Sequence, residues 1–78
     1  MLSFEMKKAP APDGSVELEI HCDSNGLESL MAQLRFLKEG RTDHVDLMSP
    51  SWGGTHIDEN PRGANRVPIR SVKILLRA

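Results

Sequence analysis

The three histidines and three of the five aspartates in this 78-residue chain are residue types that could together bind a metal ion. They are His21, His44, His56, Asp43, Asp46 and Asp58. Zinc sites use ligands at short, fixed spacings, such as two histidines on one helical face, whereas the histidines here are 23 and 12 residues apart. His44 and Asp46 share one face of an expected strand, where alternation places polar side chains in any case. We therefore interpret these residues as solvated and expect no metal site.

Cys22, Ser49 and Ser51 are the candidate nucleophiles. Cys22 falls on the apolar face of an expected strand, where a buried thiol behaves as a small hydrophobe. The two serines flank Pro50 and lack the G-x-S-x-G setting that exposes a nucleophilic serine. The glycine pair at 53–54 fits neither of the common phosphate-binding patterns, G-x-G-x-x-G and G-x-x-x-x-G-K-[ST]. We therefore expect a protein that is not an enzyme and that uses no cofactor.

The one tryptophan, Trp52, lies in the segment SPSWGG between a proline and two glycines. Its large area and N–H donor suit two uses: capping the open end of the domain's own core, or filling a pocket on a partner. For a small domain the physical expectation is the core cap. Residues 51–67 show no periodicity, and loops of this length in small domains usually carry function.

The elements that position these residues begin with two alternating segments. In residues 1–7 and 16–22, apolar and polar residues alternate with the period of a half-buried strand. Residues 12–14, Pro-Asp-Gly, have turn chemistry, because proline fixes one torsion and glycine accepts positive φ. Together they predict a β-hairpin.

Residues 24–40 then show the period of a helix. Its apolar residues form one stripe made of Leu27, Leu30, Met31, Leu34 and Leu37. Asn25 and Glu28 have the spacing of a capping box, although Asp23 or Ser24 could cap instead. Gly40 is placed to end the helix in the left-handed conformation. Phe36 points away from the stripe, where it packs against a flanking loop or contacts a partner.

Two more strands complete the expected fold. Val45 and Leu47 should face inward from a strand that ends before Pro50, because proline cannot donate to a sheet ladder. Residues 69–78 alternate again, with Pro68 at or before the start of this strand. The order β-β-α-β-β predicts a single α+β domain over residues 1–78, with a four-stranded, mainly antiparallel sheet and one helix packed on one face.

The uncovered face of such a sheet should meet solvent or a partner. It would carry Glu17, Glu19, His21, His44, Asp46, Met48, Lys73 and Leu75. Two sheet edges would also be exposed. Pairing there could produce a dimer, although Arg70 and Lys73 are residue types that discourage edge pairing.

Composition excludes several classes of protein. One cysteine excludes an internal disulfide framework, and no apolar run approaches the roughly 20 residues of a membrane span. The opening residues lack a signal-peptide pattern, so we expect a cytoplasmic protein without a membrane partner. The net charge is -1. Nucleic-acid binding is disfavoured because there is no overall basic excess, although residues 41–78 carry six basic and four acidic side chains.

The run DHVDLMSPSWGG, residues 43–54, resembles a known family. Together with the strand-helix segment VELEIHCDSNGLESLMAQL and the closing strand VKILL, it is similar to the Imm32-type immunity proteins of bacterial polymorphic toxin systems. The resemblance covers roughly residues 15–77, and the segment ENPRGANRVPIR departs from it in its extra arginine and proline.

The resemblance implies a binder that occupies and silences a cognate protein toxin. Against a basic toxin, the expected contacts are Trp52, His44, Asp46, Asp58 and Glu59, with Phe36 as an outlying contact. A small-ligand or regulatory module is the alternative. In that case the 49–66 loop would close over an anion through Arg62, Arg66 and backbone N–H groups.

Overall fold

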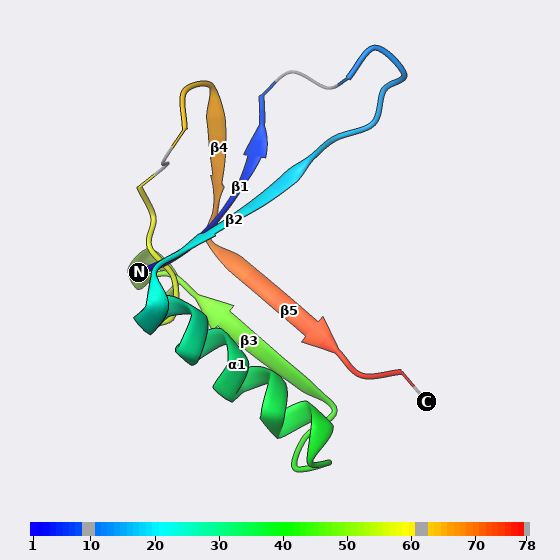
Figure 1. Ribbon diagram of the computed structural model, residues 1–78, viewed down its shortest axis with the longest axis vertical. Helices are drawn as coiled ribbons and strands as arrows, with labels where there is room; N and C mark the ends of the chain where they lie inside the picture. The colour runs from blue at the N-terminus through cyan, green and yellow to red at the C-terminus, as the bar shows by residue number, and fades with distance from the viewer. Residues whose placement is uncertain (9–10, 61–62, 78) are drawn as a thin grey trace.

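The computed structural model describes residues 1–8, 11–60 and 63–77. The chain is an α+β protein with five strands in two antiparallel sheets and one long helix (Figure 1). Its elements are β1 (Leu2–Lys7), β2 (Leu18–Cys22), α1 (Ser24–Lys38), β3 (His44–Met48), the 3-10 turn η1 (Pro50–Trp52), β4 (Arg66–Ile69) and β5 (Ser71–Leu75). The predicted α+β class is confirmed. Two sheets of three and two strands replace the predicted single sheet of four.

Sheet A has the strand order β2-β1-β4. The predicted hairpin of β1 and β2 is confirmed, with Phe4 opposite Ile20. Its turn is closed by Asp13, whose Oδ1 accepts the backbone N–H of Ser15 at 2.9 Å and the Ser15 hydroxyl at 2.6 Å. These hydrogen bonds lower the pKa of Asp13 below its usual value.

The expected last strand over residues 69–78 corresponds to β5, and a further strand, β4, begins in the segment 51–67 that showed no periodicity. The two strands belong to different sheets. β4 pairs with β1 in sheet A, and β5 pairs with β3 to form sheet B. The break lies at Arg70, whose carbonyl oxygen accepts the N–H of Ser49 at 2.9 Å. Pro68 lies before β5, as expected for the last strand, but it also lies inside the unpredicted strand β4. That position is tolerated because β4 is an edge strand.

Helix α1 begins and ends with side chains suited to those positions. Asp23 is the N-cap residue, and its carboxylate accepts the N–H of Gly26 at 2.8 Å. The predicted capping box does not form, because Asn25 lies within the helix. Gly40, with φ of 74°, takes the predicted left-handed conformation just after the helix.

The core lies where the inner ends of the two sheets meet α1. Leu2, Phe4, Leu47 and Ile57 form its buried cluster. The predicted inward positions on β3 are confirmed, since Val45 and Leu47 are both buried. Ile57 comes from the loop after η1, in which periodicity predicted no buried position.

Many apolar side chains of α1 and β2 that were expected to be buried are exposed to solvent. Of the predicted helical stripe, Leu37 is buried and Leu30 packs against the core, whereas Leu27, Met31 and Leu34 are exposed. Cys22 was expected to be buried but is also exposed, at the end of the edge strand β2. Among the described residues, no helix has both the length and the hydropathy needed to cross a bilayer.

Candidate partner-binding site

The turn that carries Trp52 is held by backbone hydrogen bonds at the end of β3. The carbonyl oxygen of Ser49 accepts N–H groups from Trp52 at 2.9 Å and from Gly54 at 3.0 Å. Gly53 has φ of 85°, which favours glycine because other residues are strained there. A Cβ atom on Gly54 would overlap the carbonyl oxygen of Met48. Both glycines are therefore required for the chain to double back against β3.

Trp52 lies on the outside of this turn. The residue is 60% exposed, so the expectation that it caps the core is wrong. Ile57, which is 3% exposed, closes the core in its place. Because the turn closes within a few residues around the buried Ser49, the indole is left at the surface.

The carboxylate of Glu59, eight residues after Ser51, holds the Pro50–Trp52 turn by a hydrogen bond. Its Oε1 accepts the N–H of Ser51 at 2.6 Å. Hydrogen bonds with the side chains of Ser51 and Ser49 and with the Ser51 backbone lower the pKa of Glu59 to about 2. Glu59, an expected partner contact, is thus engaged within the chain, where it fixes the turn that presents Trp52.

Asp58 precedes Glu59 and connects the 49–66 loop to sheet A through a backbone hydrogen bond. Its N–H donates to the carbonyl oxygen of Leu2 at 2.7 Å, and its carboxylate accepts the N–H of Asn60 at 3.2 Å. Of the expected contacts, the structure therefore gathers Trp52, Asp58 and Glu59 around one loop.

His44 and Asp46 lie together elsewhere on the molecule. His44 Nδ1 is 2.8 Å from Asp43 Oδ1, and His44 Nε2 is 3.5 Å from Asp46 Oδ2. The hydrogen bond to His44 lowers the pKa of Asp43. A strand rises about 3.3 Å per residue, which places His44 about 13 Å from Met48 at the other end of β3. The pair therefore lies along the strand that leads into the Trp52 turn, at a separation that one interface of ordinary size can span.

Phe36 lies beside the segment that leads into β3, near the end that carries His44. The guanidinium carbon of Arg41 is 5.6 Å from the centroid of the Phe36 ring, a cation–π distance. The Arg41 N–H also donates to the Phe36 carbonyl oxygen at 3.1 Å. Phe36 thus contacts a flanking loop, while its contact with a partner stays a prediction.

Sheet A carries a cluster of polar side chains that the sequence analysis did not predict. Glu5 of β1 is fully buried, and Glu19 lies opposite it on β2. His21 Nε2 is 3.2 Å from Glu5 Oε1 and 3.0 Å from Glu19 Oε1. Arg66 donates from Nε and Nη2 to the two oxygens of Glu19 at 3.0 and 2.9 Å. The N–H of Gly63 donates to Glu5 Oε1 at 3.0 Å. Strand alternation places Glu19 and His21 on one face, but the burial of Glu5 depends on the loop before β4.

Glu5, Glu19 and His21 are the described residues that could together hold a metal ion, since one ligand atom from each lies within 4.8 Å of the others. The Arg66 guanidinium binds both oxygens of Glu19. This interaction, followed by the hydrogen bond to His21, lowers the pKa of Glu19 to about 2. A divalent cation would have to displace the guanidinium. The cluster fits an ion-pair network that holds the loop before β4 against sheet A.

Ser3 lies beside this cluster, opposite His21 in the register of β1 and β2. Its hydroxyl is buried and has no hydrogen-bond partner among the described residues. A nucleophilic serine must be accessible and must contact its base, and Ser3 meets neither requirement. The sheet therefore offers no serine–histidine pair for catalysis in the described part of the chain.

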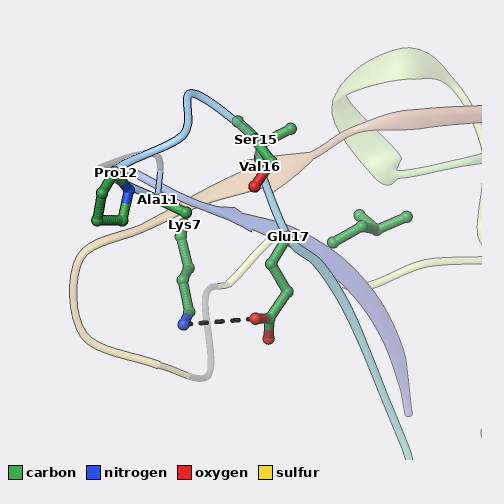
Figure 2. A pocket seen from close by; sticks show the side chains of 7 residues that line it. Lys7, Ala11, Pro12, Ser15, Val16 and Glu17 are labelled. Carbon is green, nitrogen blue, oxygen red and sulfur yellow. Dashed lines mark ion pairs between the residues drawn. The ribbon is translucent and has the colours of Figure 1, made fainter.

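A hollow opens between the arms of the β1–β2 hairpin, within residues 7–18 (Figure 2). Lys7 Nζ lies 3.5 Å from Glu17 Oε2 across it, and both side chains are exposed. The rest of the wall includes Pro12 and Val16. One exposed ion pair does not provide the convergent polar groups of a ligand site. Arg66, at the end of the 49–66 loop that was expected to close over an anion, pairs with Lys7 in the sheet but does not line the hollow.

Comparison of the chain with protein-family models, with curated proteins and with solved structures found no match in any of the three.

Proposed function

We propose that this chain is a non-enzymatic binding protein that uses the Pro50–Trp52 turn to contact a protein partner. The observation that carries the proposal is the exposure of Trp52 on a turn held by its own backbone and by Glu59. Tryptophan is among the residue types that contribute most to protein interfaces. A turn that is already ordered loses little conformational entropy when it binds.

The class of partner follows from the sequence resemblance. The immunity-type pattern includes His44, Pro50 and Trp52, and it points to a cognate toxin in the bacterial cytoplasm. Asp58 and Glu59 lie beside the turn, which suits a basic partner surface. Both acidic side chains contribute negative charge beside the turn, and Glu59 also supports it.

The alternative, an anion-binding module on the 49–66 loop, has less support. Arg66 donates to both oxygens of Glu19 and also, from Nη1, to the carbonyl oxygen of Ala64 at 2.9 Å. It is therefore committed within the chain. Arg62, the second arginine of that hypothesis, lies outside the described residues.

The proposal is tested by binding the chain to the product of a toxin-like gene encoded next to it. Calorimetric titration with the intact protein should show saturable binding. Trp52→Ala should weaken this binding at least about 30-fold, because interface tryptophans commonly contribute 2 kcal/mol or more.

Val16→Ala is the matched control. Val16 is 59% exposed, close to the 60% of Trp52, but it lies in the β1–β2 hairpin loop. The control should bind like the unmodified chain. Equal affinity of Trp52→Ala and the unmodified chain would contradict the assignment of the turn, and no binding to the neighbouring product would contradict the toxin.

A further inference from the structure

The buried core of this chain is open on one side, where it continues into exposed apolar side chains. We infer that a second copy of the chain covers this side and that the protein is a homodimer. The surface concerned, here called the open apolar face, consists of Leu18, Ile20 and Val67 of sheet A with Leu27, Met31 and Leu34 of α1.

The sheet part of this face is a direct extension of the core. In the register of sheet A, Ile20 and Ile69 flank Phe4, whereas Leu18 and Val67 flank Met6. Residues that are opposite in register share a face of the sheet. Phe4 is buried, but Leu18, Ile20 and Val67 are 44–54% exposed. Apolar rows therefore cross three strands and run out of the core into solvent.

The helix part of the face adjoins the same core. Leu30 packs against it, and at about 100° per residue Leu34, Leu27 and Met31 lie about 40°, 60° and 100° further round the helix, all in the same direction. These three side chains are 38–46% exposed. One flank of α1 is thus apolar beyond the line that touches this chain's own sheets.

The shape of the chain agrees with an incomplete core. Its Cα radius of gyration is 13.6 Å, whereas a compact domain of this length has about 11.5 Å. Figure 1 shows α1 lying along sheet B while sheet A extends away from it. Only six hydrophobic residues are buried among the described part of the chain, which is few for a domain that must fold without a disulfide or a metal.

The area and composition of the face suit a second copy. Covering its six side chains would remove about 500 Å² from water on each copy, most of the about 800 Å² per partner that a stable interface buries. None of the six carries a charge, so two identical faces meet without like-charge repulsion. If the core is complete only when the open apolar face is covered, each folded chain needs one partner molecule at all times. A second copy of the same chain is always present in equal amount.

The two parts of the face also allow a closed, two-fold arrangement. A helix flank packs well on an open sheet face. If α1 of one copy lies on sheet A of its partner, the symmetry places the partner's helix on the first sheet. Both copies then complete their cores at once, and the contact does not extend into a polymer.

The first experiment measures the mass of the full chain in solution by light scattering, from about 1 to 100 µM. We expect twice the chain mass of 8.7 kDa and a melting temperature that rises with protein concentration. A cooperatively folded 8.7 kDa monomer at all these concentrations would overturn the inference. That result would leave the proposed role of Trp52 unaffected.

Two helix variants then locate the interface. Leu34→Glu introduces a charge into the open apolar face, and Ala32→Glu introduces the same charge about 160° away on the same exposed helix. Leu34→Glu should raise the dissociation constant at least about 100-fold or prevent folding, and Ala32→Glu should remain a folded dimer. If Leu34→Glu dimerises like the unmodified chain, or if both variants lose the dimer equally, this face is not the interface.

Discussion

Replacing Trp52 by alanine measures how much its indole contributes to the fold. With 60% of the residue exposed, about 100 Å² of its area is covered, worth at most about 2.5 kcal/mol at about 25 cal/mol per Å². The unfolded chain is not fully extended and alanine keeps part of the contact, so we expect a loss of about 1 kcal/mol. For a domain of this size that loss lowers the melting temperature by about 4–8 °C.

The assay is urea unfolding followed by far-ultraviolet circular dichroism, because removing the one tryptophan also removes its fluorescence. All variants are compared at one protein concentration. Leu47→Ala is the reference for a buried site, since Leu47 is 1% exposed, and it should cost about 2–5 kcal/mol. A loss for Trp52→Ala as large as that for Leu47→Ala would refute the surface assignment.

Three further substitutions test the supports of the fold. Gly54→Ala should destabilise the protein in urea by about 1–3 kcal/mol, because the added Cβ meets the backbone of Met48; an unchanged midpoint would contradict this. The pKa of Glu19 is lowered from 4.5 to about 2, so its pairing with Arg66 stabilises the fold above about pH 4.5 and is lost as the pH falls towards 2. Glu19→Gln should therefore reduce the fall in melting temperature across this range, and an equally steep fall would contradict the pairing. Asp23→Ala removes the helix cap and should cost about 1 kcal/mol in the same urea assay, whereas Asp23→Asn should retain most of that stability.

Patterns in neighbouring residues predicted the strands, turns and helix ends that depend on neighbouring residues alone. Alternation identified β1, β2 and β3, and the turn at residues 12–14 joined the first two. Gly40 was recognised at the end of the helix because this cap depends on a few neighbouring residues, whereas Asp23 was only one of the alternatives to the predicted capping box. The inward side of β3 followed from the same period of two.

Features that depend on distant parts of the chain were not predictable in this way. β4 begins in the segment 51–67, which shows no periodicity, and no local pattern marks Arg70 as the residue where the chain passes from one sheet to the other. Ile57 enters the core from a loop without any period. The burial of Glu5 requires residues near 63 to fold over β1.

The candidate site was predicted in part. Position in a glycine-rich loop singled out Trp52, but packing alone decided that its indole is exposed. The residues Leu27, Met31 and Leu34 were expected to be buried because they are apolar, yet periodicity does not reveal which surface covers a stripe. Asp58 and Glu59 were linked to Trp52 through their charge, whereas the geometry links Glu59 to it through Ser51.

Pro68 affects how this protein avoids uncontrolled assembly. It lies in β4, an outer strand of sheet A, and it has no N–H to offer to an incoming strand. Strand-by-strand growth, as in amyloid fibrils, needs a continuous row of donors along a sheet edge. With apolar side chains exposed on the adjacent face, the missing donor makes this edge a poorer template for fibril growth.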